Sequence, residues 1–488
     1  MYDLEEQLAE LERSGLRRRL RLISGPQGPR VLLDGRPALL LCSNNYLGLA
    51  DHPRVREAAA EGARRWGVGA GASRLVSGSM TIHRRLEERL AEFEHTQSCL
   101  LFGSGYLANT GTIAALAGPD DVIFSDELNH ASIVDGCRLA RARTIVYRHG
   151  DVEHLARCLA GEHCSGERVI VTDSVFSMDG DIAPLPAIVE LAERFEARLI
   201  VDEAHATGAL GPGGRGALAA AGLQGQADVV VGTLGKALGS YGAYVCADEP
   251  TIQFLINRAR PFIFSTAPAP PAVAGALAAL ELLQERPDRV GRLRAAARQL
   301  RGALAQAGFA VSDSEMHIIP LVVGDERAAL ALSRGASERG VFVQAIRPPS
   351  VPAGTTRLRL TVMASHTASE LRSAARLLGR LAEGLGLDPA QIGEPAPAPA
   401  ESLAADVRPA GELLGSASAV GGVAAAGAAA QVPPGPAHRL PAQPIGPERS
   451  GEEAQTDSYE LAQRAPAGGS THSAPFDVER EGLSRQAA

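Results

Sequence analysis

Short runs of apolar residues alternate with amphipathic stretches over the first half of the chain. Continuous apolar runs without polar alternation are typical of parallel strands buried on both faces. The stretches between them, such as PLPAIVELAERFEA at 184–197, have the apolar spacing of helices that cover a sheet. The pattern therefore predicts an α/β domain built on a mostly parallel sheet. The expected strands lie in 99–104, 121–126, 143–148, 168–173, 197–205, 228–236 and 242–247.

The rhythm changes near residue 287, where longer amphipathic stretches alternate with short apolar runs. This change predicts a second, smaller α+β domain, which the N-terminal segment joins. The expected helices are 288–308, 326–340 and 367–385, and the expected strands are 317–323, 341–346 and 356–362. The predicted organisation is an N-terminal helix and strand segment at 1–45, a large domain at 46–286, a small C-terminal domain at 287–390 and a tail at 391–488.

The tail is rich in Ala, Pro and Gly, and beyond residue 395 its only aromatic residues are Tyr459 and Phe476. Such a composition buries too little apolar surface to offset the entropy lost on ordering. We expect a disordered, dispensable extension. The alternative is a segment that binds a partner.

The overall composition excludes several classes of protein. The net charge of −8 with scattered arginines argues against nucleic-acid binding. No stretch approaches the roughly 18 apolar residues of a membrane span. The six cysteines form no CxxC pair and the start does not resemble a secretory signal, so we expect a cytoplasmic protein without a metal site. His149, His154 and His163 are interpreted as surface residues.

Lys236 is the single lysine among 48 basic residues. Arginine replaces lysine readily on a solvated surface, but a guanidinium stays protonated and cannot act as a nucleophile. A primary amine is needed where a protein forms a Schiff base with a carbonyl group. The alternative is that one lysine remains by chance in an arginine-rich chain. Chance does not explain why Lys236 lies directly after a predicted strand.

Further polar groups follow the predicted strands. Ligands of open α/β sheets bind beyond the carboxyl ends of the strands, so these groups are expected to meet at one edge. Each has a simpler reading as a turn or a helix cap, but together they match the needs of pyridoxal phosphate: an amine, a carboxylate, an imidazole and a phosphate-binding turn. A dinucleotide site is excluded because G-x-G-x-x-G is missing. The groups are Ser104, Gly105, Tyr106, His130, Asp173, Asp202, His205 and Thr233.

Residues 38 to 385 resemble the α-oxoamine synthases. These are pyridoxal-phosphate enzymes of fold-type I, the aspartate aminotransferase-like class, and they join an amino acid to an acyl thioester with loss of CO2. The resemblance implies an acyltransferase that works as a homodimer with shared active sites. The matching motifs are CSNNYLGLADHP, GVGAGASRLVSGSMTIHRRLEERLAEF, SVFSMDGDIAPL, VDEAHATGALGPGGRG, GTLGKALGSYGAYV and FIFSTAPAPP.

The resemblance assigns roles around the cofactor. It implies that Lys236 carries pyridoxal 5′-phosphate covalently, that Asp202 pairs with the pyridine nitrogen and that His205 pairs with the ring hydroxyl. His130 is expected to stack on the ring. It also places Ser104, Gly105 and Tyr106 at the phosphate, with Thr233 nearby, Ser177 against the cofactor and Thr266 at the phosphate of the partner subunit's cofactor.

The resemblance also implies a substrate site at Arg17, Asn44, His130 and Ser350, with Arg359 gripping the substrate carboxylate. Arg357 shares a strand face with Arg359; both arginines could be solvated, and this interpretation suits Arg357 better because it lies nearer the start of the strand. The chain departs from the family at Asn45 and Ala206, where Asp and Gly are usual. A third departure is Asp173, a shorter carboxylate than the usual Glu, at a position that contacts the acyl substrate.

The stretch AIRPPSVPAGTTRLRLTVMASH is most similar to the branch of the family that condenses L-alanine with a pimeloyl thioester in biotin biosynthesis. The thioester is carried by coenzyme A or by acyl carrier protein. The alternatives are the branch that joins glycine to acetyl-CoA, an aminotransferase, and a non-catalytic scaffold that acts through its tail.

Overall fold

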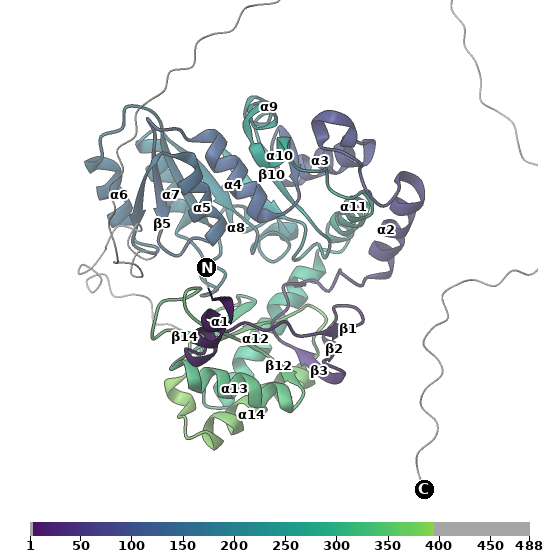
Figure 1. The fold of residues 1–488 in the computed structure, drawn as a ribbon, viewed down its shortest axis with the longest axis vertical. Coiled ribbons are helices and arrows are strands. Elements are labelled where there is room, and N and C mark those ends of the chain that lie inside the picture. The colour runs from purple at the N-terminus through teal and green to yellow at the C-terminus, as the bar shows by residue number, and fades with distance from the viewer. Residues whose placement is uncertain (1–2, 395–488) are drawn as a thin grey trace, which may run out of the picture. The chain divides into compact units, whose positions relative to one another are not determined.

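The computed structural model describes residues 3–394, and the expectations for the tail beyond them fall outside the described residues. A seven-stranded sheet with the order β4-β10-β9-β8-β7-β5-β6 forms the centre of the large domain (Figure 1). Every apolar run expected in this domain forms one of its strands. The strands are β4 (Ser98–Phe102), β5 (Val122–Asp126), β6 (Arg143–Tyr147), β7 (Arg168–Asp173), β8 (Ala197–Asp202), β9 (Val229–Thr233) and β10 (Ala243–Ala247).

The strands β9, β8, β7, β5 and β6 run parallel, whereas β10 is antiparallel to both of its neighbours, β9 and β4. β10 runs antiparallel to β9 because the connection between these two strands is too short for the crossover that a parallel pair needs. The backbone N–H of Leu234 donates to the carbonyl of Gly242 over 3.0 Å and closes this connection as a hairpin. The hairpin contains Lys236.

Helices cover both faces of this sheet, as the continuous apolar strands predict. Alternate residues of each strand enter two separate cores: Phe102 and Ile123 belong to one, Leu101 and Phe124 to the other. The first core includes α4 (Gly105–Leu116), α5 (Ala131–Ala140), α9 (Glu249–Arg258) and α10 (Arg260–Ile263). The second includes α2 (Pro53–Trp66), α3 (Thr81–Glu94), α6 (Val152–Gly161), α7 (Leu185–Arg194), α8 (Ala217–Ala220) and α11 (Pro270–Glu285). Short helical turns lie at Arg74–Gly78 and Pro212–Gly214.

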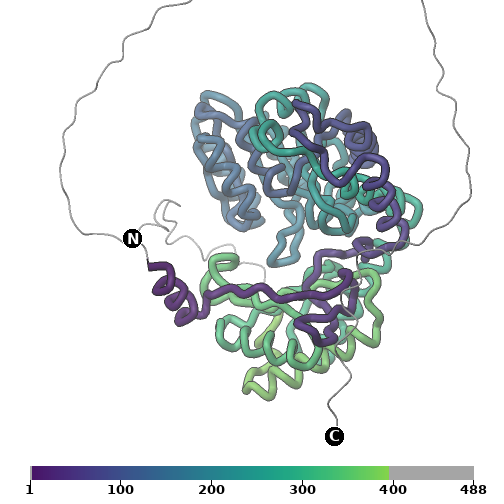
Figure 2. The backbone as a smooth tube through the Cα atoms, turned by 45° about the vertical axis from the view of Figure 1, so that its right-hand side comes forward, coloured from purple at the N-terminus to yellow at the C-terminus, as the bar shows by residue number. Residues whose placement is uncertain are grey.

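The small domain has a three-stranded sheet, β11-β14-β13, and three long helices. The expected strand at 341–346 is split in two: β12 pairs with β3 of the N-terminal segment and β13 pairs with β14. Strand β3 of the N-terminal segment therefore pairs with a strand of the C-terminal part, and Figure 2 shows this segment in purple beside the green C-terminal part. The elements are β1 (Ile23–Ser24), β2 (Arg30–Leu33), β3 (Arg36–Leu40), α12 (Asp288–Gln306), β11 (Ile318–Gly324), α13 (Glu326–Glu338), β12 (Val341–Phe342), β13 (Gln344–Ile346), β14 (Thr356–Thr361) and α14 (Ala368–Gly384).

Both ends of the described chain have defined contacts. Asp3 is the N-cap residue of the first helix, α1 (Leu4–Arg13), and its carboxylate accepts hydrogen bonds from two backbone N–H groups. None of the residues of α1 is buried. At the other end, after a short turn at Pro389–Gln391, the carboxylate of Glu394 forms a 2.7 Å ion pair with Arg301. No helix within 3–394 has the length and apolar character needed to cross a membrane.

Candidate active site

Lys236 lies in the β9–β10 hairpin, directly beyond the carboxyl end of β9. Gly239 makes the tight return possible because its φ is +62° and an added Cβ would lie 2.3 Å from the backbone nitrogen of Ala50. The lysine amine makes no hydrogen bond or ion pair with any of the residues 3–394. Burial lowers the pKa of Lys236 to about 8, although the charges of Asp202 and Asp173 oppose this shift. The amine is therefore uncharged far more often at neutral pH than that of an ordinary lysine, although the charged form still predominates.

Asp202 ends β8, the strand that pairs with β9, and its carboxylate is buried. Two hydrogen bonds fix it: Nδ2 of Asn109 donates to one oxygen over 2.6 Å, and the backbone N–H of Ala204 donates to the other over 2.8 Å. Asn109 comes from α4, the helix that begins at Ser104. The carboxylate is thus positioned by the same helix whose N-terminus is the expected phosphate site.

His205 is buried three residues beyond Asp202. Its Nδ1 lies 2.7 Å from the hydroxyl of Tyr46, which also donates to Oδ1 of Asn44 over 3.0 Å. The same Asn44 oxygen accepts a hydrogen bond from Nη1 of Arg359 over 3.2 Å. Burial holds the pKa of His205 well below its usual value, and the charges of Lys236 and Arg359 lower it further. Hydrogen bonds through Tyr46 and Asn44 therefore connect the imidazole with the expected carboxylate-binding arginine.

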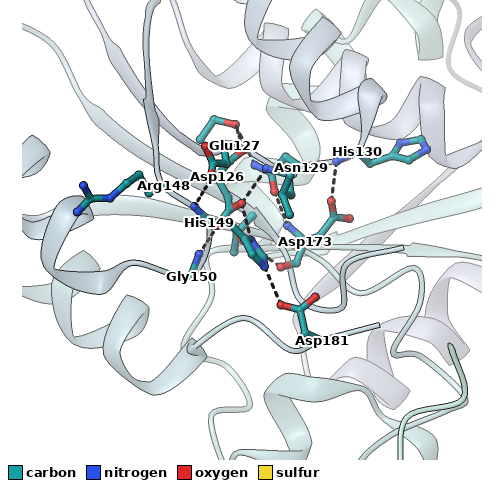
Figure 3. Close-up of polar contacts among 12 residues, drawn as sticks. Asp126, Glu127, Asn129, His130, Arg148, His149, Gly150, Asp173 and Asp181 are labelled. Carbon is teal, nitrogen blue, oxygen red and sulfur yellow. Dashed lines mark hydrogen bonds and ion pairs between the residues drawn. The ribbon is translucent and has the colours of Figure 1, made fainter. Parts of the chain in front are cut away.

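His130 is the N-cap residue of α5, and its side chain is exposed. Its backbone N–H donates to Asp173 over 2.7 Å, while the backbone N–H of Asp173 donates to Oδ1 of Asn129 over 2.8 Å (Figure 3). Burial raises the pKa of Asp173 well above its usual value, and the charge of Asp202 adds to this effect. The shorter carboxylate at this position thus holds the backbone that carries the His130 ring.

The residues expected at the phosphate lie at the start of α4. Ser104 is the N-cap residue, and its hydroxyl accepts a hydrogen bond from the backbone N–H of Leu107 over 3.3 Å. Gly105 and Tyr106 follow as the first residues of the helix, where backbone N–H groups have no partner within the helix. Thr233 is buried at the end of β9.

Three expected site residues make no hydrogen bond or ion pair with this group within residues 3–394. Arg17 is exposed and forms an ion pair with Glu12 at 3.3 Å. Ser350 is exposed, and its backbone N–H donates to the carbonyl of Arg347. Thr266 is also exposed and forms an isolated β-bridge with Ser73.

Three residues for which a surface position was the favoured interpretation are buried or partly buried: Arg357, His149 and His154. Arg357 is buried and forms an ion pair with Asp179, because both faces of β14 are covered. His149 is partly buried and lies between two carboxylates, 2.9 Å from Asp126 and 2.7 Å from Asp181. His154 is also partly buried and accepts a hydrogen bond from the backbone N–H of Arg148, whereas His163 is exposed as expected.

The donor set fits pyridoxal phosphate. A partly buried amine without a protein partner is available for a covalent bond to an aldehyde. A buried, fixed carboxylate can pair with a pyridine nitrogen, an exposed imidazole can cover a ring face, and the N-terminus of α4 can bind a phosphate. These four groups follow strands of one sheet, at the same edge of that sheet.

Comparison with known proteins decides the family. The aminotransferase class I and II family matches residues 36–378. The chain belongs to this family. Among its members, 8-amino-7-oxononanoate synthase from Geobacter sulfurreducens is 52% identical over 383 residues, which cover 78% of this chain and 98% of the relative. The enzyme of the same name from Anaeromyxobacter dehalogenans is 52% identical over 365 residues, covering 75% and 92%.

Solved structures of family members agree with the fold. Serine palmitoyltransferase from S. paucimobilis with bound pyridoxal phosphate and myriocin has a TM-score of 0.75 at 32% identity, covering 78% of this chain and 97% of that one. The 8-amino-7-oxononanoate synthase from Francisella tularensis has a TM-score of 0.62 at 26% identity, covering 72% and 99%. The predicted α-oxoamine synthase resemblance and the fold-type I architecture are confirmed.

Several residues of the site were not predicted from the sequence. Tyr46 lies inside a quoted motif, but nothing in the pattern indicates that its hydroxyl meets His205. Asn109 lies within the helical pattern after Ser104. Asp126 could have been identified from the sequence, because it ends a predicted strand as Asp173 and Asp202 do.

Proposed function

We propose that the chain is an 8-amino-7-oxononanoate synthase, which condenses L-alanine with a pimeloyl thioester and releases CO2 and the thiol carrier. The observation that carries the proposal is the lone amine of Lys236, with its pKa lowered to about 8, beside Asp202 and His205. The identity of about 50% to enzymes of that name over nearly their whole length supports the choice of reaction.

Pyridoxal phosphate is the cofactor, and when bound it withdraws electrons from the α-carbon of the amino acid. Lys236 is the residue that would hold it, with Asp202 at the pyridine nitrogen, His205 at the ring hydroxyl and His130 over the ring. Ser104 and the first residues of α4 would bind the phosphate, with Thr233 nearby and Ser177 against the cofactor.

The lysine amine is also suited to move the proton at the α-carbon of alanine. General base catalysis is most effective when the pKa of the base is near the working pH, and the lowered pKa of Lys236 meets this condition. The amine would accept this proton and would return one after CO2 has left.

Arg359 is proposed to bind the carboxylate of alanine. Nε donates to the carbonyl of Ser177 and Nη1 donates to Asn44, so the outer edge of the guanidinium keeps N–H groups for a ligand. A planar guanidinium can grip a carboxylate with two parallel hydrogen bonds. Arg17, Asn44 and Ser350 complete the proposed substrate site.

We further propose a homodimer with shared active sites, in which Thr266 reaches the cofactor phosphate bound by the partner subunit. The exposure of Thr266 in the single chain is consistent with this role. The acyl group is delivered by coenzyme A or by acyl carrier protein.

A product assay tests the function. Purified enzyme is incubated with alanine, glycine or serine, each combined with a pimeloyl or an acetyl thioester, and the products are identified by mass. Alanine with the pimeloyl thioester is expected to give the highest kcat/KM. Faster reaction of glycine with acetyl-CoA would overturn the proposal in favour of the sibling activity.

A further inference from the structure

The connection that follows β7, residues 174–183, is a closed loop that we call the β7 loop. Val175 and Ile182 form a β-bridge across it, and the backbone N–H of Phe176 donates to the carbonyl of Asp181 over 3.1 Å. Gly180 has a φ of +73°, and an added Cβ would lie 2.6 Å from the carbonyl oxygen of Ile318 in the small domain. The loop is therefore a defined unit that packs closely against β11.

One side of the β7 loop holds the two buried arginines of β14. Nε of Arg359 donates to the carbonyl of Ser177, and Nη1 of Arg357 forms an ion pair with Asp179. The Ser177 contact, together with the hydrogen bond from Nη1 to Asn44, fixes the orientation of the Arg359 guanidinium, because both nitrogens lie in its plane. The position of the loop therefore decides where the outer edge of Arg359 points.

The other side of the β7 loop is attached to the end of β5 by His149 (Figure 3). Nε2 of His149 lies 2.7 Å from Oδ2 of Asp181, and Nδ1 lies 2.9 Å from Oδ1 of Asp126. The ring also packs edge-on against Phe176, with 4.3 Å between ring centroids. His149 thus contacts the loop at two residues.

The anchor in this arrangement is Asp126. Its carboxylate is buried and accepts hydrogen bonds from the backbone N–H groups of Leu128, over 2.9 Å, and Gly150, over 3.0 Å. Asp181, by contrast, has a half-exposed side chain, with 46% of its surface accessible. The bridge therefore joins a fixed carboxylate in the sheet to a carboxylate on the loop.

His149 is protonated in this bridge. An ionised carboxylate only accepts hydrogen bonds, so a ring between two carboxylates donates from both nitrogens. Burial alone would lower the pKa of His149, but the hydrogen bonds and charges of Asp126 and Asp181 outweigh it and raise the pKa to about 10. Both contacts are then charge-assisted hydrogen bonds, which are stronger than neutral ones.

We propose that His149 and Asp181 are positioning residues for amino-acid binding: their ion pair fixes the β7 loop so that Ser177 holds Arg359 in the orientation that receives the substrate carboxylate. This inference rests on the carboxylate-binding role proposed for Arg359. Neither His149 nor Asp181 contacts Arg359 directly. Their effect passes through the backbone of the loop.

The test uses Asp181→Ala in the full-length enzyme loaded with cofactor. This change removes a half-exposed side chain and leaves the buried pair of Asp126 and His149 in place, so the fold is preserved. The matched control is Glu127→Ala, because Glu127 is exposed and accepts a hydrogen bond from the backbone N–H of His149 over 2.8 Å without touching the loop. Calorimetry measures the Kd for alanine, kinetics give the KM for the pimeloyl thioester, and the melting temperature reports on folding.

Asp181→Ala is expected to raise the Kd for alanine about fivefold, a typical size for coupling through a packed network. The thioester KM, the cofactor absorbance and the melting temperature are expected to change little, and Glu127→Ala to resemble the wild type. Asp181→Asn keeps an oxygen that accepts from Nε2 and should recover part of the lost affinity. His149→Gln, which can donate to only one of the two carboxylates, should weaken alanine binding in the same direction.

An unchanged alanine Kd in Asp181→Ala would overturn the inference, as would an equal loss of affinity for both substrates. Failure of the proposed function gives a different result. In that case the wild-type enzyme itself would show no binding of alanine in the same titration, whether or not it binds glycine or serine.

Discussion

The hydroxyl of Tyr46 lies 2.7 Å from Nδ1 of His205. The single proton of that hydroxyl is donated to Oδ1 of Asn44, an oxygen that also accepts from Arg359. The tyrosine oxygen therefore accepts a hydrogen bond from Nδ1–H, and Nε2 of the neutral imidazole is left as a hydrogen-bond acceptor. An acceptor at this position suits a partner with a hydroxyl group, such as the ring hydroxyl of the cofactor.

Tyr46→Phe should remove the hydrogen bond that keeps the proton of neutral His205 on Nδ1. Loss of the buried hydrogen bonds is expected to lower the free energy of unfolding by about 1–2 kcal/mol, since the partners are left unsatisfied. Urea denaturation measures this loss, and the position of the cofactor absorbance band should shift in the same variant. The control is Tyr241→Phe, at an exposed tyrosine, where no change is expected. A Tyr46→Phe enzyme with wild-type spectrum and stability would contradict the assignment.

The lowered pKa of Lys236 predicts how cofactor loading depends on pH. Because only the neutral amine attacks an aldehyde, uptake of pyridoxal phosphate by the cofactor-free protein should rise with pH around a midpoint near 8 and then level off. An ordinary lysine would give a rise that continues towards its usual pKa of about 10.4. Stopped-flow absorbance measures the rate, and Lys236→Ala should show no covalent uptake at any pH.

The same pKa sets the sign of a stability change in the cofactor-free protein. Between pH 8 and 10.5 the unfolded chain binds more protons at Lys236 than the folded chain, so its contribution to stability increases as pH rises through this window. Below pH 8 the penalty for the buried charge is fully present. If the rate of cofactor uptake had its midpoint near pH 10 instead of pH 8, the amine of Lys236 would be solvated in the native protein, and both of these predictions would be wrong.

Arg359→Lys should weaken alanine binding by about tenfold, because lysine cannot form two parallel hydrogen bonds to a carboxylate. The thioester KM and the cofactor absorbance should change little, as determined by steady-state kinetics and a spectrum of the purified enzyme. Arg357 is unsuitable as a control because it is buried against the β7 loop. The exposed Arg372 provides one, and Arg372→Lys should behave as wild type. Normal alanine affinity in Arg359→Lys would place the carboxylate site elsewhere.

The last described residues predict where the chain can be shortened. Arg301 is buried and bonds both to Glu394 and to the carbonyl of Ile318. A chain that ends after Glu394 should keep the turnover and melting temperature of the full chain. One that ends after Ile392 should lose about 3 kcal/mol, because it leaves a buried charge without its partner. Thermal unfolding of the two shortened chains separates these outcomes, and equal melting temperatures would contradict the role of Glu394.

The sequence predicts the frame of the fold and the reactive groups better than the contacts that position them. Strand ends alone indicate Asp202, His205 and Lys236, because parallel strands bring their carboxyl ends to one edge. The burial of Arg357 could not be predicted, since alternation along β14 shows which residues share a face but not what covers that face. The contact of Asn109 with Asp202 could not be predicted either, because the packing of α4 on α5 and β8 determines the hydrogen-bond partners of its amide.

The backbone of the sheet also sets a distance across the site. Phe102 of β4 and Thr233 of β9 both pair with Ala243, on opposite edges of β10. Because β10 is antiparallel to both, β4 and β9 end at the same edge, separated by two strand spacings, or roughly 10 Å. The turn at Ser104 follows one of these ends and Lys236 follows the other. The distance between the strand ends that precede Ser104 and Lys236 is therefore fixed by main-chain pairing of three strands, and it does not depend on the side chains of the proposed site.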